Sequence, residues 1–362
     1  MTKFSNTPYK TSKKSRFSLS KKRVIIILII FALIIAGIIF VLSQQEDTQQ
    51  STQNTVVKEE KPAPPPPPKS KLTGLTLENS TLAERPVTGM MIENSPDSRP
   101  QSGLLQADMV FEAIAEGGVT RFLATYQEST PDYIGPVRSA RPYYIDYILG
   151  LDGSYGHVGG SPEALQDIKT LGVKDLDQFF NPSGYYRISS RYAPHNMYTD
   201  FSRIDTMNQQ KGYTKSEFKP LERKPDVPQT PTAKVIKLNL SGPNYNPTFT
   251  YDTANNIYLR SQAGSPHTDQ KSGEQIKSKA VVALVTEKGN GSDGYHSSYK
   301  TTGAGKVFVF QDGVVSEGTW SKADRKASLV LTDKYGLPLK LTAGKTWITL
   351  VGSTSDVRYS AQ

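Results

Sequence analysis

The stretch from Ala107 to Gly160 reads ADMVFEAIAEGGVTRFLATYQESTPDYIGPVRSARPYYIDYILGLDGSYGHVGG and decides the fold class of the chain. Apolar runs suited to buried strands alternate in it with two Gly-Gly pairs and with charged residues. Strands that end in glycine and charge are where α/β proteins place their ligand sites. The stretch therefore predicts an α/β domain with a site at the ends of its strands.

Three strands are expected in this first domain, at 87–92, 109–115 and 119–127. Glu93 and Asn94, which follow the first strand, are candidate ligand-binding residues, and so is Ser161. Three carboxylates belong to the second strand and the turn after it: Asp108, Glu112 and Glu116. Glu112 and Glu116 are an even number of residues apart, so on a regular strand they share a face. These carboxylates are the candidates for acid–base work or for cation binding. The alternative is a solvated strand face followed by a turn residue.

Three arginines indicate an anion site: Arg121, Arg138 and Arg141. Pro142 biases Arg141 away from helical geometry and suits the first position of a helix over 142–150. A helix N-terminus favours anions, and a guanidinium group binds phosphate or carboxylate with two hydrogen bonds. The alternative is that these arginines form internal ion pairs with Glu93 or Glu112.

A second helix start follows a short strand at 155–158. Gly159 and Gly160 form the turn, Ser161 is suited to cap the helix, and Gly172 ends it. A strand, a glycine turn and a helix N-terminus together predict another anion-binding loop. If the two strands are neighbours in one sheet, both helix starts face the same crevice.

The histidines give no recognisable catalytic pattern. His157 is a weak catalytic candidate, and His195 is grouped with the ligand-binding residues, although a lone histidine is more often structural. No Ser-His-Asp spacing is present, and the chain has no cysteine. We therefore expect no metal site and no cofactor, and we consider Mg²⁺ only for the case that the protein is a transferase.

Most of the excess positive charge of the chain lies at its N-terminus. Residues 1–23 hold eight of the 43 basic residues and no acidic one, so the formal net charge of +9 does not indicate a nucleic-acid partner. Residues 24–42 carry no charge and are almost entirely Val, Ile, Leu and Phe, which predicts a transmembrane anchor. Basic residues before the span place the N-terminus in the cytoplasm and the rest of the chain outside. A cleaved signal peptide is the alternative.

The remaining boundaries follow from composition. Residues 43–71 are polar and proline-rich, which predicts a disordered spacer. The first folded domain spans 72–219 and has a mixed sheet with flanking helices. A proline-rich linker at 220–232 precedes a smaller, mostly-β domain at 233–356, in which Asp312-Gly313 between apolar runs predicts a hairpin.

Several motifs occur in an order that resembles the YerB-like family of bacterial extracytoplasmic proteins: RPVTGMMIENSPDSRPQSGL, ADMVFEAIAEGGVTRF, IGPVRSARPYY, HVGGSPEA, PHTD, DGVVSEGTW and GKTWITLV. Members are usually two-domain lipoproteins of Gram-positive bacteria with no assigned activity. The resemblance implies a cell-envelope protein on the outer face of the plasma membrane. This chain lacks the lipid-bearing cysteine and has the 24–42 run in its place.

The chain has a second similarity, to the LytR-CpsA-Psr wall-polymer ligases, which concerns only the order of motifs along the sequence. Asp108, Arg138 and the Gly159-Gly160 turn follow one another as in that family, where the aspartate lies near Mg²⁺ and arginines hold a polyprenyl pyrophosphate. Ala107, Met109 and Ser139 replace family residues beside these positions.

Three functions stay open at this point. The first is binding of an anionic wall or lipid-linked ligand by the arginines and the Gly159-Gly160 turn. The second is a non-enzymatic interaction or scaffold protein whose motif residues hold the two domains together; its protein partners are unknown. The third is a phosphoryl or glycosyl-phosphate transferase. Arginines facing an open cleft favour the first or third, whereas arginines paired with buried carboxylates favour the second.

Overall fold

The computed structural model describes residues 21–46 and 66–362, which belong to two separate compact units. The first unit contains helix α1 (Lys21–Glu46), which includes the expected anchor. Among the helices of the described ranges, none meets the combined requirements of length and apolarity for crossing a membrane. The basic tail up to residue 20 and most of the expected spacer, 47–65, lie outside the described residues.

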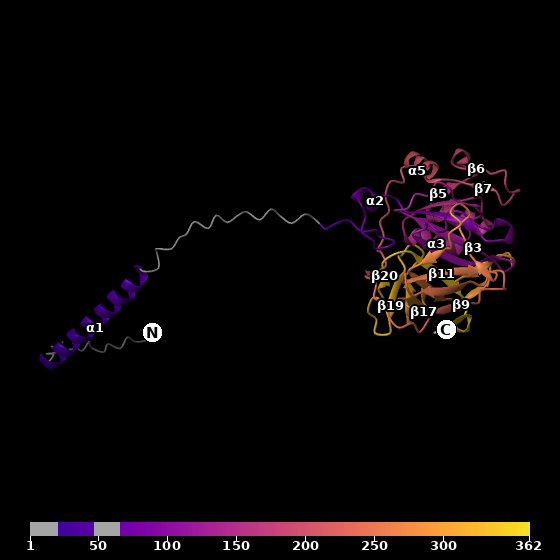
Figure 1. The fold of residues 1–362 in the computed structure, drawn as a ribbon. Helices are drawn as coiled ribbons and strands as arrows, with labels where there is room; N and C mark the ends of the chain where they lie inside the picture. The colour runs from indigo at the N-terminus through magenta and orange to yellow at the C-terminus, as the bar shows by residue number, and fades with distance from the viewer. Residues whose placement is uncertain (1–20, 47–65) are drawn as a thin grey trace, which may run out of the picture. The chain divides into compact units, whose positions relative to one another are not determined.

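The second unit, from residue 66 onward, contains the folded part of the chain (Figure 1). Its α-helices are α2 (Ser80–Glu84), α3 (Pro142–Gly150), α4 (Pro162–Leu171) and α5 (Phe201–Gln210). Short 3-10 helices lie at η1 (Pro96–Ser98), η2 (Pro182–Gly184) and η3 (Thr354–Asp356). The sequence predicted α3 and α4 with nearly these bounds.

A ten-stranded mixed sheet forms the centre of this unit, in the order β19-β18-β17-β14-β21-β2-β3-β1-β4-β5. Its strands are β1 (Thr88–Glu93), β2 (Met109–Glu116), β3 (Val119–Tyr126), β4 (Ser154–His157), β5 (Lys174–Asp177), β14 (Ala280–Val285), β17 (Gly303–Gln311), β18 (Val314–Lys322), β19 (Val330–Asp333) and β21 (Thr346–Val351). Parallel pairing of β2 with β21 joins the two halves, so residues from both expected domains share one sheet.

The smaller sheets come mainly from the second half of the chain. One contains β9 (Val235–Leu238), β10 (Thr248–Asp252), β11 (Ile257–Gln262), β12 (Ser265–Pro266), β13 (Lys277–Ser278) and β22 (Val357–Ser360). Two-stranded pairs are β15 (Lys288–Asn290) with β16 (Ser297–Tyr299), β20 (Leu341–Thr342) with β8 (Arg223–Lys224), and β6 (Tyr186–Arg187) with β7 (Met197–Tyr198). The mixed α/β fold with a strand-rich second half agrees with the predicted class.

The central sheet is covered on both faces, which explains why its strands are apolar almost throughout. Side chains of alternate residues, such as Phe111 and Leu123, pack against α3 and α4 on one face. The other set, such as Val110 and Phe122, packs against α5 and the sheet of β9, β10 and β11. Two hydrophobic cores, one on each face, therefore hold the unit together.

The ends of the helices follow the local rules expected from the sequence. Pro142 begins α3, and the Ser161 hydroxyl accepts a hydrogen bond from the Ala164 N–H to cap α4. Gly172 ends α4 in the left-handed conformation, at φ 69°. These caps place the N-termini of α3 and α4 at one edge of the sheet.

Candidate functional site at the carboxyl edge of the sheet

The carboxyl ends of β1, β2, β4 and β5 lie at the same edge of the central sheet. β1, β4 and β5 pair in parallel, and β2 runs the same way because β3 is antiparallel to both β1 and β2. The edge therefore collects most of the residues that the sequence marked: Glu93, Asn94, Glu116, Arg121, His157, Gly159 and Gly160.

Glu112, within β2, is fully buried and forms an ion pair with Arg260 of β11, which is also fully buried. Both Glu112 oxygens accept from the Arg260 Nη2, at 2.9 and 3.0 Å. The Trp347 Nε1 donates to the same carboxylate at 2.9 Å. Since Arg260 and Trp347 come from the second half of the chain, Glu112 connects the two halves.

The polar network extends from this pair toward the end of β1. The Thr120 hydroxyl donates to Glu112 at 3.2 Å and accepts from the Asn94 side chain at 2.6 Å. Gln101 lies within hydrogen-bond distance of the Asn94 oxygen and of the His267 Nε2. Burial and the nearby Arg260 charge hold the pKa of His267 well below its usual value. His267, the histidine of the PHTD motif, is buried within this network.

Arg260 was missed by the sequence analysis, and the reason is the pattern of its strand. Hydrophobicity assigns Ile257 and Leu259 to the core, but Tyr258, Arg260 and Gln262 are the buried set in β11. The only signal that was available is that Arg260 alternates with Tyr258 and therefore shares its face of the strand. Its partner Glu112 lies 148 residues away in sequence.

Glu116 does not share a face with Glu112, contrary to the expectation from their even spacing. The pairing register of β2 with β3 shifts between Ile114 and Glu116, which marks a β-bulge. An extra residue at a bulge reverses the alternation of side chains. Glu112 therefore points to the face with Arg260, while Glu116 points to the face with α3.

Arg121 and Arg141 are both buried, and both pair with Glu116. The Arg121 Nη2 lies 2.7 Å from one carboxylate oxygen, and the Arg141 Nη2 lies 2.5 Å from the other. Burial raises the pKa of Glu116, but the two guanidinium groups outweigh it and the pKa is lowered. The expectation that these two arginines face an open crevice is therefore corrected: the carboxylate of Glu116 occupies the space between them.

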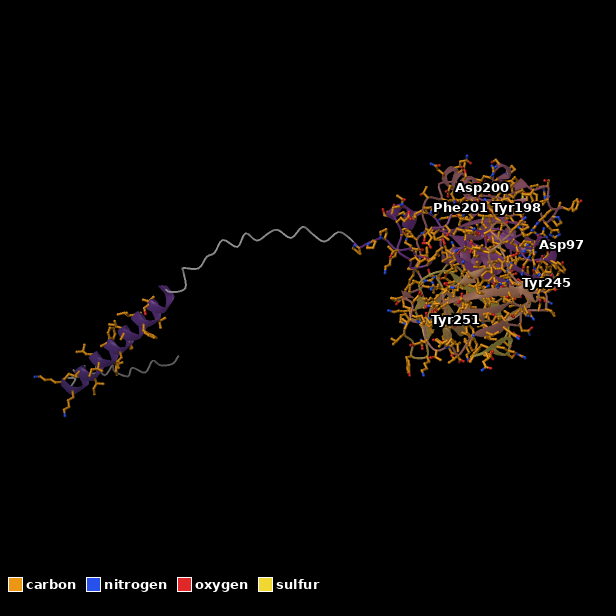
Figure 2. The ribbon with its side chains drawn as sticks, viewed as in Figure 1. Asp97, Tyr198, Asp200, Phe201, Tyr245 and Tyr251 are labelled. Atoms are coloured by element: carbon orange, nitrogen blue, oxygen red, sulfur yellow. The ribbon has the colours of Figure 1, made fainter. Side chains whose placement is uncertain are left out.

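Arg138 is the arginine of this group that reaches solvent, with a quarter of its side chain exposed. Its Nε lies 3.4 Å from Glu93, whose carboxylate is also 3.0 Å from the His195 Nδ1. Ser95 donates to Glu93 at 2.8 Å. Asp97 lies exposed at the surface (Figure 2), and its carboxylate is 4.0 Å from the His195 Nε2. Ser95 and Glu93 both approach the Nδ1, so this is not the arrangement of a catalytic triad, in which serine and carboxylate use opposite ring nitrogens.

The Gly159-Gly160 turn lies beside the Arg138–Arg141 segment, as the sequence predicted. Ala140 donates its N–H to the Gly159 carbonyl at 2.8 Å, and Ala140 forms a β-bridge with Gly160. The Gly159 N–H, however, donates to the Asp177 carboxylate at 2.9 Å. An internal carboxylate thus occupies the position that was expected for a bound anion. Ser161 is engaged as the α4 cap.

His157 is fully buried, and both of its ring nitrogens face oxygen acceptors. Its Nδ1 is 2.8 Å from the Gly159 carbonyl, and its Nε2 is 3.0 Å from Asp175. It therefore fixes the glycine turn against β5 and has no ring nitrogen directed at solvent.

Asp108 lies at the opposite edge of the sheet from Glu116. The eight residues of strand between them correspond to roughly 25 Å. The three carboxylates therefore do not gather around one turn, which is a correction to the sequence-based picture. Across the described residues, no group of three or more His, Asp or Glu side chains is placed to hold a metal ion. The transferase hypothesis named Asp108, Glu112 or Glu116 as its candidates, and the structure does not bring the three together around a cation.

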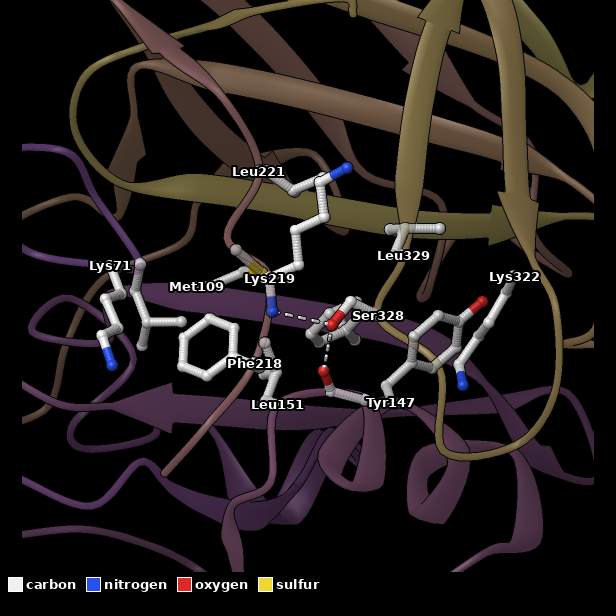
Figure 3. Close-up of a pocket in the computed structure, with 13 residues that line it drawn as sticks. Lys71, Met109, Tyr147, Leu151, Phe218, Lys219, Leu221, Lys322, Ser328 and Leu329 are labelled. Carbon is white, nitrogen blue, oxygen red and sulfur yellow. Dashed lines mark hydrogen bonds between the residues drawn. The ribbon is translucent and has the colours of Figure 1, made fainter. Parts of the chain in front are cut away.

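A narrow apolar slot lies between β2, α3 and the segments around Phe218 and Leu329 (Figure 3). Ser328 closes one side, since its hydroxyl accepts from the Lys219 N–H and donates to the Gly150 carbonyl. The volume of the slot is about 20 Å³, which is room for about one water molecule. The slot is therefore part of the packing between the two halves and is too small for a ligand.

Comparison with known proteins places this fold in a family. Residues 72–214 match the family model described as "Protein of unknown function (DUF3048) N-terminal domain". Residues 236–348 match the model of the corresponding C-terminal domain. The chain belongs to this two-domain family. The ion pair between Glu112 and Arg260 therefore joins the N-terminal domain to the C-terminal one.

One relative is the protein named "Putative lipoprotein YerB" from Bacillus subtilis strain 168. It is 32% identical over 293 residues, which are 78% of this chain and 86% of the relative. The crystal structure of the YerB protein from Bacillus subtilis matches with a TM-score of 0.73 and 31% identity, and the match covers 81% of this chain and 99% of that one. The predicted resemblance to the YerB-like family is confirmed.

Proposed function

We propose that this protein is anchored in the plasma membrane by α1, presents its folded unit on the extracytoplasmic side of the cell envelope, and acts by binding and not by catalysis. The relative named as a putative lipoprotein supports an anchored protein outside the cytoplasm. In this chain the apolar run from Val24 to Leu42 takes the place of a lipid.

Exposed apolar side chains on α1 support the anchor. Within its described residues, large side chains from Ile25 to Leu42 are about half exposed or more, for instance Leu33 and Phe40. A helix that is apolar on all sides requires an apolar surrounding. Basic residues before the run and their absence directly after it give an N-terminus in the cytoplasm.

Protease added to intact protoplasts tests this orientation. We expect loss of the folded unit and survival of a fragment that carries the N-terminal tail, detected with tags at the two ends. Replacing Ile30 and Ile34 by lysine costs about 3 kcal/mol of insertion free energy per charge and should release the protein or block its insertion. Protection of the folded unit in intact protoplasts would contradict the proposed side.

The buried pair of Glu112 and Arg260 is the observation that supports a non-catalytic role. Of the carboxylates that could serve catalysis, Glu112 is saturated by Arg260, Thr120 and Trp347, and Glu116 by two arginines. A catalytic carboxylate needs access to a substrate proton. Glu112 instead holds the two domains in one arrangement, as a scaffold or interaction protein requires, while Glu116 pairs with arginines of its own domain.

Glu112→Gln provides the test, because it leaves the Arg260 charge buried without a partner. Removing one member of a buried pair costs about 3–5 kcal/mol. We therefore expect a large decrease in the urea midpoint of unfolding. The matched control is Glu287→Gln, which breaks an ion pair with Lys300 in which the carboxylate side chain is 80% exposed and should cost less than about 1 kcal/mol. Equal, small effects of both substitutions would argue that Glu112 is free for chemistry.

A second candidate function, binding of an anionic ligand, is supported by the direct ion pairs that the three arginines make. Three guanidinium groups, of Arg121, Arg138 and Arg141, face only two carboxylates, of Glu93 and Glu116. Within the described part of the chain, the buried Nε atoms of Arg121 and Arg138 have no hydrogen-bond partner. His195 and Asn94 border the same group. Arg138, a quarter of whose side chain is exposed, is the guanidinium group that an anion could reach.

Arg138→Ala and Arg141→Ala separate this candidate from a purely structural role. Arg141→Ala should lower stability by about 2–4 kcal/mol, because it removes a buried partner of Glu116. Arg138→Ala should change stability by less than about 1 kcal/mol and should weaken pyrophosphate binding at least tenfold, measured by calorimetry. Arg138→Lys should rescue binding only in part. If wild-type protein binds no pyrophosphate, the anion candidate fails and the scaffold proposal stands.

A further inference from the structure

An open groove lies between α4 and the loop that follows β5, on the edge of the central sheet. Its volume is about 680 Å³, which is within the range of small-molecule sites in proteins. Leu165, Ile168, Val173, Phe179 and Phe180 form its apolar walls, and Gly159 lies at its floor, in reach of the Phe179 ring. The groove is distinct from the arginine group and from the interdomain network.

Phe179 and Phe180 are the unusual feature of this groove. Their exposed fractions are 68% and 78%, and the neighbouring Leu165 is 42% exposed. Single apolar side chains on a surface are common, but adjacent ones around a hollow mark a binding site. The exposed apolar walls of the groove therefore favour binding of an apolar group.

The charged groups that line the groove are not equally available. Asp175 accepts from His157 and from the Asp177 N–H, and Asp177 accepts from the Gly159 and Phe179 N–H groups. Lys169, in the last turn of α4, is exposed and makes no ion pair with any residue in 66–362. Lys169 is thus the one cation among the side chains that line the groove, and each of the two aspartates has one oxygen engaged in these hydrogen bonds.

The same hydrogen bonds argue against an extended peptide as the occupant. β5 is an edge strand, and a peptide could add to it only through free backbone groups. The Asp177 N–H is already taken by the Asp175 carboxylate. This edge is therefore protected against strand addition, and the occupant contacts side chains.

We propose that this groove binds a single amphiphile, an aliphatic chain that ends in an anionic head group such as carboxylate or phosphate. The chain packs against Phe179, Phe180 and Leu165, and the head group pairs with Lys169. The proposal rests on the proposed function in one respect: an anchored protein works beside a lipid surface, where such molecules occur. It names the class of ligand that the binding protein takes.

Photo-crosslinking gives a test that locates the ligand. The full chain is reconstituted in phosphatidylcholine nanodiscs and irradiated with a 12-carbon fatty acid that carries a diazirine near its tail. Tryptic peptides are then mapped by mass spectrometry. We expect Asp175–Arg187, which contains both phenylalanines, to carry most of the label found within residues 66–362. The double substitution Phe179→Ala/Phe180→Ala should lower that fraction at least fivefold.

A second measurement tests whether the anionic head group of the ligand pairs with Lys169. Lys169→Gln should lower labelling by the acid at least threefold and leave labelling by the matching uncharged alcohol unchanged. The control Tyr335→Ala/Leu337→Ala removes two exposed apolar side chains elsewhere and should change nothing. All of these side chains are exposed, so unfolding midpoints should stay constant and exclude misfolding as the cause.

Two outcomes would overturn the proposal. One is label spread over the surface, or retained after the phenylalanine substitutions. The other is equal labelling by acid and alcohol with no effect of Lys169→Gln. Neither outcome affects the protoplast or Glu112→Gln experiments, so failure of the groove and failure of the proposed function are distinguishable.

Discussion

Asp108 is a single residue in which desolvation and hydrogen bonding oppose each other. Its carboxylate is fully buried and accepts hydrogen bonds from the Gln127 and Glu128 N–H groups and from the Ser129 hydroxyl. Those bonds favour the charged form. Burial and the neighbouring Glu128 charge outweigh them and raise the pKa of Asp108 to about 6. The residue thus anchors a turn in a protonation state that changes within the mildly acidic range.

The raised pKa predicts a specific dependence of stability on pH. An unfolded aspartate has a pKa of about 3.9, so the folded state binds its proton more tightly. The resulting stabilisation is fully present below about pH 4 and is lost as pH rises through about 6, by about 3 kcal/mol. Asp108→Asn should remove this dependence. Urea midpoints of unfolding are measured for both proteins at pH 4.5 and pH 7.5. Between these two pH values the midpoint of the parent should fall relative to that of Asp108→Asn.

The difference between parent and variant is the quantity to read, because other groups titrate in both proteins. Asparagine can keep the two backbone hydrogen bonds through its oxygen and can donate to Ser129 through its nitrogen. A constant difference across the pH range would mean that Asp108 titrates near its normal value.

The hairpin of β17 and β18 is the element in which local sequence has the clearest effect. Its turn residues Asp312 and Gly313 both have positive φ, 55° and 82°, as the Asp-Gly pair predicts. Asp312 also accepts from Asn256 and pairs with Lys224, which joins the turn to neighbouring segments. The hairpin is thus defined by its two-residue turn and held by contacts outside it.

Gly313→Ala should be more damaging than an equivalent change at Gly336. A Cβ at Gly313 would lie 2.8 Å from the Tyr251 ring, whereas one at Gly336 would meet nothing within 4 Å, although both residues have φ near 80°. Backbone strain alone costs about 1–2 kcal/mol. We expect that cost for Gly336→Ala and an additional 1–3 kcal/mol of overpacking for Gly313→Ala, measured by thermal unfolding. Similar costs at both sites would show that Tyr251 moves aside without penalty.

At the scale of the whole folded unit, contacts on both faces of the central sheet join the two domains. Glu112 and Arg260 do so on one face. On the other face Arg325 pairs with Asp146 of α3 and Asp167 of α4, at 2.5 and 2.7 Å. Burial raises the pKa of Asp146 despite hydrogen bonds from Thr301 and Arg325. With β2 and β21 paired between these faces, neither domain retains a complete core alone.

We therefore expect residues 66–362 to unfold in one cooperative transition. Both tryptophans, Trp320 and Trp347, are in the C-terminal domain, so their fluorescence reports on that domain, whereas far-UV circular dichroism reports on both. Urea curves from the two probes should coincide. Arg325→Ala should shift both curves together. Separated curves, with fluorescence and dichroism changing at different urea concentrations, would contradict a shared cooperative unit.

Sequence alone determined the local features of this protein. The helices at Pro142 and Ser161, the Gly172 cap and the Asp312-Gly313 hairpin were all predictable, because each depends on residues within a few positions. The apolar alternation also predicted a mixed α/β half followed by a strand-rich half. The Arg138–Arg141 segment does meet the Gly159-Gly160 turn, but the contact is a bridge between Ala140 and Gly160, since β3, the strand before Arg138, ends at Tyr126 and is antiparallel to β1.

Only the tertiary structure decided which charges meet. Whether Glu116 faces Arg141 or Arg260 depends on a one-residue bulge in β2, and no rule of spacing reveals it. The partner of Glu112 comes from a strand 148 residues away, and its choice depends on how two sheets pack. Burial then makes each pairing obligatory, because an unpaired charge in the core would cost several kcal/mol. Local chemistry thus specified the elements, and the packing of distant segments determined which of their polar residues remain available to a ligand.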